Sequence, residues 1–364
     1  MIGVLFAVML VTLLIGVPVG FSIGMSCLAF IMTSGGSFSI IAQRMCEGVS
    51  SFTMMALPMF MLSGAIMAYG SSPRLMRLAM LIVGRMPGGL GAAGCAALGF
   101  FGAVSGSGVA STAAIGGLMG PEMVKDGYGK GITASLMAAG GAMASLIPPS
   151  LVMVVYGSSS GASIGEMFLA GIIPGCLVIF GLMALIVFLA VKRNYPSGYV
   201  KHNFKEIMFI IADALLPLMT PVIILGGVMS GMFTPTESAV VSCVYAFLLA
   251  VFVYKELTLK QFIKVAADSA IGSAVILLII AAATPLGWIL AIENVPQNFT
   301  AWLMGITSSK VLIIAVITVI LLILGTFMET VSIIILMTPI LLPIMTGFGY
   351  TPVQFGIILL MNTA

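Results

Sequence analysis

Two short stretches of the sequence place oxygen ligands for a small cation where a helix is interrupted. Residues 102–112 read GAVSGSGVAST, so serine hydroxyls stand among glycines. Glycine lets the backbone leave a helix, which exposes carbonyl oxygens, and the hydroxyls add further ligands. Residues 144–150 contain Pro148-Pro149, which ends a helix and frees the carbonyls before it. Both stretches would suit a small hard cation such as sodium at membrane depth, since irregular backbone survives there only in a cavity or inside protein.

Each stretch also has a purely structural explanation. The glycines and serines suit a seam where two helices pack closely, and the prolines suit a simple kink. A third candidate, Glu329, is an acid inside an otherwise apolar stretch, so it binds a cation, carries a proton or hydrogen-bonds a turn. Glu237 follows Thr234-Pro235 and is expected in the first turn of a helix. Asp213 and Asp268 are expected near the cytoplasmic ends of their spans.

The composition identifies a membrane protein. Of the 364 residues, 61% are hydrophobic and only 7% are charged, and the mean hydropathy is +1.25. A soluble domain carries about 25% charged residues, so the composition excludes a soluble enzyme, a nucleic-acid binder and a disordered chain. The net charge of +3 is too small for contacts with a phosphate backbone. We find no motif of an acid–base pair, metalloprotease or phosphate loop, and predict an all-α, multi-pass protein of the lipid bilayer that is not an enzyme.

Two pairs of apolar runs are too short to cross a bilayer comfortably. The pairs are 89–104 with 108–123 and 310–325 with 331–347. Each run reaches about 24 Å as a helix, against a hydrocarbon core of about 30 Å. Each pair is either two ordinary helices or a re-entrant hairpin, and the length favours the hairpin. With two hairpins, all lysines and arginines except Arg44 and Lys310 fall on one face, which is then cytoplasmic.

The two halves of the chain resemble each other. Pro343 follows Pro121 by the same number of residues as the dipeptide Gly349-Tyr350 follows Gly127-Tyr128. The crossings give the halves opposite orientations, which is typical of secondary transporters, although chance matching in a biased composition is the alternative. We predict an inverted repeat of residues 1–206 and an incomplete 207–364, with these parts: scaffold helices 1–33 and 207–254, hairpins at about 89–123 and 310–347, and a broken helix at about 131–157.

The segments GAVSGSGVASTAAIG, MAAGGAMASLIPPS and GMFTPTESA resemble the large membrane subunit of tripartite ATP-independent periplasmic (TRAP) transporters, and the resemblance covers essentially the whole chain. It implies a multi-pass protein of the bacterial inner membrane that works with a small membrane subunit and a periplasmic substrate-binding protein. It also implies sodium-driven uptake of a carboxylate, such as a C4-dicarboxylate or sialic acid, by an elevator mechanism. Two rivals remain: a stand-alone sodium–carboxylate symporter and a non-transporting scaffold subunit.

The resemblance also implies site residues. One sodium ion is expected at the Ser105 hydroxyl, and its other ligands are the carbonyls of Gly102, Ala144, Ile147 and Pro149. A second sodium ion is expected near Gly325, and the substrate between the hairpin tips, near Ser107, Ser150 and Glu329. The last residues align with 138–142, so the counterpart of Pro148-Pro149 is missing and the chain looks C-terminally truncated.

The hydroxyl of Ser105 can be tested directly. The Ser105→Ala substitution removes one oxygen ligand of the expected sodium site. Carboxylate uptake into reconstituted liposomes should then need a higher sodium concentration. Unchanged sodium dependence would count against the site.

Overall fold

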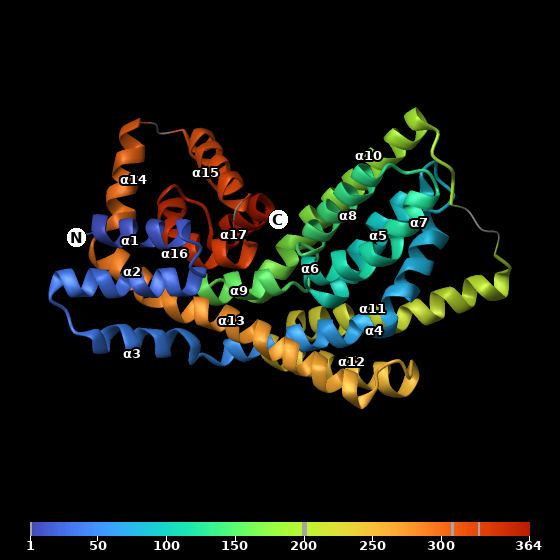
Figure 1. Cartoon of the computed structure of the whole chain (residues 1–364), viewed down its shortest axis with the longest axis horizontal. Helices are drawn as coiled ribbons and strands as arrows, with labels where there is room; N and C mark the ends of the chain where they lie inside the picture. The colour runs from blue at the N-terminus through green and yellow to red at the C-terminus, as the bar shows by residue number, and fades with distance from the viewer. Residues whose placement is uncertain (1, 199–201, 307–308, 327) are drawn as a thin grey trace. The chain divides into compact units, whose positions relative to one another are not determined.

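All regular elements in the described part of the chain are helices, most of them apolar (Figure 1). The computed structural model describes residues 2–198, 202–306, 309–326 and 328–364. Lys201, which is one of the cations expected on the cytoplasmic face, and Phe327, which belongs to the second expected hairpin, lie outside these ranges. Among the described residues, six helices are long and apolar enough to cross a membrane. The contacts divide the chain into two compact units, each built from several segments.

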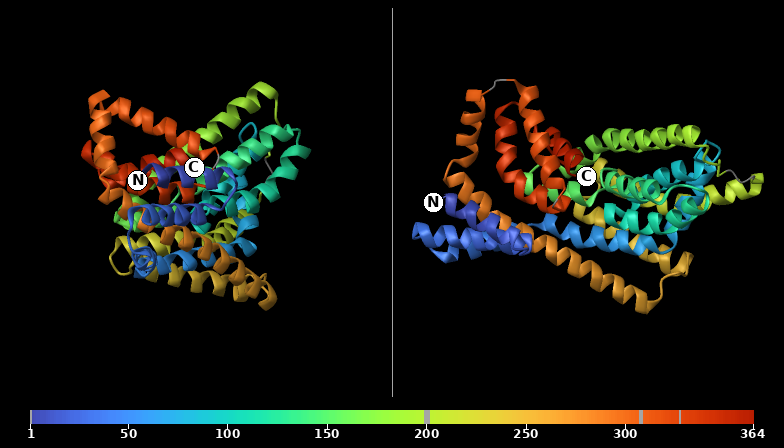
Figure 2. Two further views of the ribbon diagram at one scale, coloured as in Figure 1. Left: turned by 60° about the vertical axis from the view of Figure 1, so that its left-hand side comes forward. Right: turned by 45° about the horizontal axis from the view of Figure 1, so that its top comes forward.

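Unit 1 comprises Met1–Met55, Val154–Ser163 and Ile271–Thr363. Its N-terminal helices α1 and α2 lie side by side, as both views of Figure 2 show. The elements of this unit are α1 (Ile2–Leu14), α2 (Val19–Ser34), α3 (Phe38–Val49), a short 3₁₀ turn (Phe52–Met55), most of α9 (Leu151–Ser160), the second part of α13 (Leu259–Ile292), α14 (Val295–Ile306), α15 (Lys310–Gly325), α16 (Thr330–Gly347) and α17 (Pro352–Thr363).

Unit 2 comprises Ala56–Met153 and Ile164–Ala270, together with Ala364. Its elements are α4 (Ala56–Val83), α5 (Gly89–Ser105), α6 (Gly108–Ser111), a π-helical turn (Thr112–Gly116), α7 (Gly117–Lys125), α8 (Lys130–Ala144), α10 (Ile164–Arg193), α11 (Phe204–Met229), α12 (Pro235–Leu248), a second π-helical turn (Leu249–Val253) and the first part of α13.

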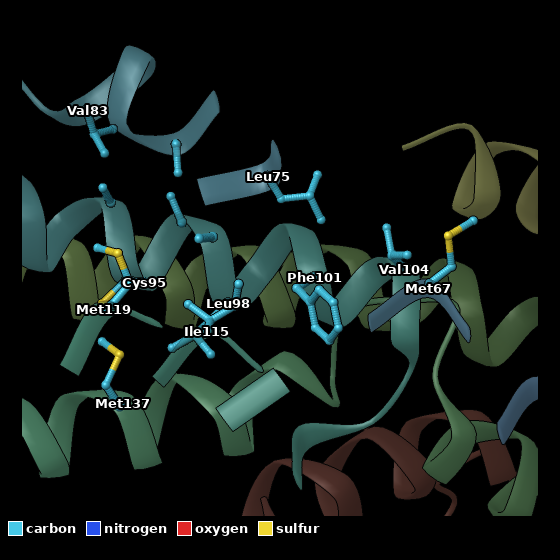
Figure 3. Close-up of a cluster of buried hydrophobic side chains, with 14 of the residues drawn as sticks. Met67, Leu75, Val83, Cys95, Leu98, Phe101, Val104, Ile115, Met119 and Met137 are labelled. Carbon is cyan, nitrogen blue, oxygen red and sulfur yellow. The ribbon is translucent and has the colours of Figure 1, made fainter. Parts of the chain in front are cut away.

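Helix α5 forms the centre of unit 2. Its side chains Leu98, Phe101 and Val104 are almost fully buried, and they lie between α4 on one side and α7 and α8 on the other (Figure 3). Helices α5 and α8 pack side by side (Figure 1). The glycines and alanines of α5 let its neighbours approach closely, as expected where lipid supplies no hydrophobic driving force between helices.

The helix interruptions lie where the sequence predicts them. Helix α5 ends at Ser105 and α6 begins at Gly108, and α8 ends at Ala144 before the two prolines. The second half repeats this order, because the starts of α15, α16 and α17 follow one another at nearly the same spacing as the starts of α5, α6 and α8. This spacing agrees with the repeat seen in the sequence. The opposite orientations and the boundary at residue 206 stay predictions, because both units contain segments from either half.

Some helices differ from the apolar runs. Helices α3 and α14 were not expected, because each carries polar or charged residues on one side and so forms no continuous apolar run. Helix α13 begins at Leu259, several residues before the apolar stretch that follows Asp268. Helix α4 extends to Val83, although its backbone is not helical at Tyr69 and Gly70, where Gly70 has a φ of 84°. Glycine adopts this left-handed conformation without the strain of a side chain.

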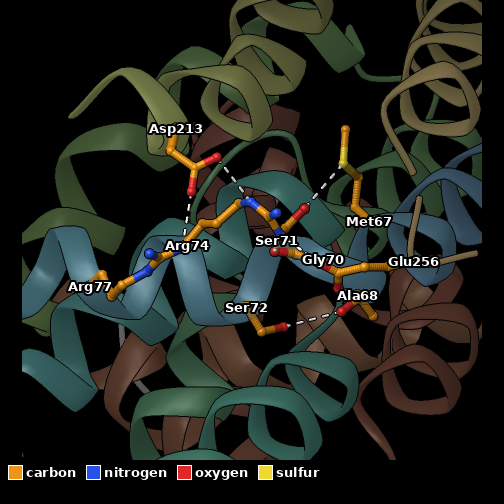
Figure 4. A network of polar contacts seen from close by, with 9 residues as sticks. All are labelled: Met67, Ala68, Gly70, Ser71, Ser72, Arg74, Arg77, Asp213 and Glu256. Atoms are coloured by element: carbon orange, nitrogen blue, oxygen red, sulfur yellow. Dashed lines mark hydrogen bonds and ion pairs between the residues drawn. The ribbon is translucent and has the colours of Figure 1, made fainter. Parts of the chain in front are cut away.

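Just after the kink, Arg74 joins three parts of unit 2 (Figure 4). Its guanidinium donates to Asp213 of α11 at 3.0 Å and to Glu256, which precedes α13, at 3.0 Å. It also hydrogen-bonds the Gly70 carbonyl and lies 3.8 Å from the ring centroid of Tyr254. Arg77 donates to the second oxygen of Asp213 at 2.9 Å. The side chains of Arg74 and Asp213 are each only 16% exposed, so this pair is shielded from water far more than a surface pair.

Loss of Arg74 should therefore lower the stability of the protein. In Arg74→Gln, Glu256 loses its arginine and Asp213 keeps only Arg77, so the free energy of unfolding should fall by about 2 kcal/mol. The matched control is Lys125→Gln, which breaks the exposed pair with Glu122 and should cost less than about 1 kcal/mol. Thermal unfolding of the two purified variants checks this, and equal midpoints would contradict the role given to Arg74.

Candidate functional site

The tip of the first hairpin is a tight turn between α5 and α6. The residue after α5, Gly106, has a φ of 66°, and its N–H donates to the Gly102 carbonyl at 2.7 Å. The next residue, Ser107, caps α6, because its Oγ accepts the N–H of Ala110 at 3.3 Å. The chain therefore reverses over a very short connection, and α6 and α7 pack back against α5. Whether this pair is a re-entrant hairpin or two crossing helices stays a prediction.

Two serine hydroxyls and one serine carbonyl oxygen gather at this tip. The Ser105 side chain is buried, and its Oγ lies 3.3 Å from the Oγ of Ser111 and 3.4 Å from the carbonyl oxygen of Ser107. The fully buried Ser111 hydroxyl donates to the same carbonyl at 2.7 Å. Ser111 was not among the predicted site residues, although its spacing of four from Ser107 on a helix is the signal that places them together.

The interruption after α8 packs directly on the tip. The N–H of Leu151, at the start of α9, donates to the Gly106 carbonyl at 3.1 Å. A Cβ on Gly102 would lie only 2.5 Å from the Ala144 carbonyl oxygen, and one on Gly106 only 3.1 Å from that of Pro149. The structure thus brings together Gly102, Ser105, Ala144 and Pro149, which were predicted as sodium ligands. Whether they bind sodium stays a prediction.

Ile147 and Ser150 lie in the same interruption. The Ile147 N–H donates to the Ala144 carbonyl at 3.2 Å, and its side chain approaches Gly99 of α5 and Gly175 of α10. The Ser150 side chain is 2% exposed, and its Oγ has no hydrogen-bond partner among the described residues. Six other buried side chains in the described part of the chain share this feature, so Ser150 stands out only because it lies in the interruption that packs on the tip.

The remaining predicted residues belong to unit 1. A Cβ on Gly325, at the end of α15, would lie 3.7 Å from the Asn362 carbonyl oxygen, and Thr330 donates to the Thr363 carbonyl at 2.8 Å. The second hairpin therefore packs on α17 much as the first packs on α8. Glu329 is exposed and precedes α16 without a side-chain hydrogen bond to the helix end. This geometry does not support the interpretation that Glu329 only stabilises the turn.

The polar atoms around Ser105 at the tip of the first hairpin are neutral oxygen atoms. Hydroxyls and carbonyls surround Ser105, while in the described part of the chain no three His, Cys, Asp or Glu side chains gather into a metal-binding group. Carbonyl and hydroxyl oxygens at a break in a membrane helix suit an alkali cation, and free N–H groups at helix starts suit an anion. The interrupted helices and the apolar spans define an all-helical, multi-pass membrane protein, and interrupted helices of this kind are typical of secondary transporters.

Comparison with known proteins agrees with this class. Residues 6–364 match the tripartite ATP-independent periplasmic transporter family, DctM component. The chain is 41% identical over 363 residues to the isethionate TRAP transporter permease protein DctMQ of Oleidesulfovibrio alaskensis, covering 99% of this chain and 57% of that protein. It is 37% identical over 366 residues to the sialic acid TRAP transporter large permease protein SiaM of Vibrio cholerae, covering 99% and 83%.

The C4-dicarboxylate TRAP transporter large permease protein DctM of Rhodobacter capsulatus is 36% identical over 376 residues, with 99% of this chain and 85% of that protein covered. Among solved structures, the Alcanivorax borkumensis YdaH transporter superimposes with a TM-score of 0.59 at 12% identity, over 89% of this chain and 76% of that one, so this likeness concerns the fold alone. The chain belongs to the DctM family of TRAP large permeases. It is accordingly a multi-pass protein of the bacterial inner membrane.

The close approach of Gly102 to Ala144 makes a testable prediction. In Gly102→Ala the new methyl group meets the α8 backbone, so the free energy of unfolding should fall by about 1–3 kcal/mol. The control Gly117→Ala adds a methyl group where nothing lies within 4 Å, and should be neutral or stabilising by about 1 kcal/mol. Thermal unfolding distinguishes the two, and a Gly102→Ala variant as stable as the control would show that the tip does not pack on α8 this closely.

Proposed function

We propose that this chain is the membrane permease of a sodium-driven uptake system for a small organic anion. Membership of the DctM family supports transport. The main support for the sodium and anion sites is the hydrogen bond between Leu151 and Gly106, which holds the hairpin tip against the broken helix. Around it lie the Ser105 and Ser111 hydroxyls and the unpartnered Ser150 Oγ.

The proposed coupling follows from geometry. Sodium at the tip would neutralise part of the charge of an anion bound beside it and would hold the two interrupted helices together. An ion drives transport only if it binds the substrate-loaded state more tightly than the empty one. In this proposal the hairpin tip and the helix break make sodium bind more tightly when substrate is present, because sodium and the substrate anion need the same backbone conformation there. The movement between the two sides of the membrane is proposed to be an elevator displacement of the hairpins and broken helices.

The substrate is proposed to be a carboxylate such as a C4-dicarboxylate or sialic acid, as the names of two relatives indicate. The name of a third relative indicates isethionate, a sulfonate, so the class extends to small organic anions in general. A small membrane subunit and a periplasmic binding protein are the proposed partners, as in a tripartite system.

Uptake into liposomes tests the function. The chain is reconstituted with its small subunit, and labelled succinate, sialic acid and isethionate are each supplied with the binding protein. We expect uptake of at least one anion under an inward sodium gradient and at least tenfold less uptake when choline replaces sodium.

Omitting the binding protein is the control for a tripartite system, and uptake should then fall to background. Undiminished uptake would instead identify a stand-alone symporter. Equal uptake in sodium and choline would overturn sodium coupling, and no uptake of any anion under any gradient would favour a non-transporting scaffold.

A further inference from the structure

A cavity of about 220 Å³ in unit 2 reaches the hairpin tip. Ser105, Ser107 and Ala110 line it from the tip and α6, and Leu151 lines it from the start of α9. The opposite wall comes from α4 and from the first part of α13, where the lining residues include Asp268. A cavity of this size holds several water molecules. Asp268, which is exposed, and Ser105, which is buried, therefore line the same small cavity.

Asp268 has no partner among the residues that the structure describes. Within that part of the chain it makes neither a hydrogen bond nor an ion pair, and Lys264, one helical turn earlier, does not pair with it. The contrast with Asp213, which is held by two arginines, is clear. In a protein with only 11 acidic residues, an unpaired carboxylate beside a cluster of neutral oxygens adds the negative charge that the cluster itself lacks.

From this arrangement we infer that Asp268 attracts and retains the cation at the hairpin tip, an inference that rests on the sodium site proposed above. The walls of this cavity are mostly apolar, and low-dielectric walls concentrate the field of a charge in a cleft. Asp268 acts through the few water molecules of the cavity rather than as a direct ligand, and so raises the occupancy of sodium at Ser105.

The experiment measures sodium binding without transport. The full chain, purified with its small subunit, is unfolded by heat at increasing NaCl, with choline chloride keeping the ionic strength constant. The sodium concentration that gives half of the stabilisation should rise about threefold to tenfold in Asp268→Asn, the change that one charge at close range produces. A second neutral variant, Asp268→Ser, should behave in the same way if the asparagine variant folds poorly.

Two controls separate charge from structure. Asp268→Glu keeps the charge and should stay within about twofold of the unmodified protein. Glu122→Gln removes one exposed acid at the end of α7, outside the cavity lining, and should leave the half-effect concentration unchanged. Both should unfold at the same temperature in choline as the unmodified protein.

The possible outcomes test the role of Asp268 separately from the proposed sodium site. If the unmodified protein is stabilised by sodium and both neutral variants keep its half-effect concentration, the role of Asp268 is overturned while the sodium site stands. If sodium stabilises the unmodified protein no more than choline does, and Ser105→Ala changes nothing, the sodium site is overturned and the role of Asp268 with it.

Discussion

Every interruption of a helix in a bilayer leaves backbone N–H and C=O groups that lipid cannot satisfy. In this protein two interruptions meet and satisfy one another. Gly106 donates back to Gly102 and accepts from Leu151, so the hairpin tip and the break after α8 are joined by the groups that each would otherwise leave unpaired. The contact is possible because glycines at the tip let backbone approach backbone. The feature that stabilises the hairpin is thus also the feature that collects hydroxyl and carbonyl oxygens.

Much of the fold could be predicted because glycine and proline act locally. The chain reverses at Gly106 and its helix breaks at Pro148-Pro149. Glu237 lies in the first turn of α12 as expected, where it and Thr234 also cap the helix start reciprocally. Helices α3 and α14 could not be found by the same reasoning, because a helix with one polar side carries no long apolar run. The division into two units was not predicted either, because each unit joins segments that are distant in the sequence.

The sequence predicted those site residues that lie together in one segment. It did not predict residues that reach the site from distant segments. Gly102 and Ser105 follow from one glycine–serine stretch, and Ala144 and Pro149 from the interruption after α8. Asp268 comes from a helix in the other half of the sequence, and only the folded chain shows that it shares a cavity with Ser105. In the same way, Arg74 and Asp213 are far apart in the sequence, and their charges alone did not indicate that they pair.

The composition of α5 has a consequence for how this part of the protein becomes ordered. Most of its residues are glycine or alanine, GLGAAGCAALGFFGAVS, and nearly all are buried. Burying a long side chain freezes its rotamers at an entropic cost, whereas glycine and alanine have no rotamers to lose. The helix at the centre of unit 2 can therefore be enclosed with little of that loss, which falls mainly on a few larger side chains such as Leu98 and Phe101.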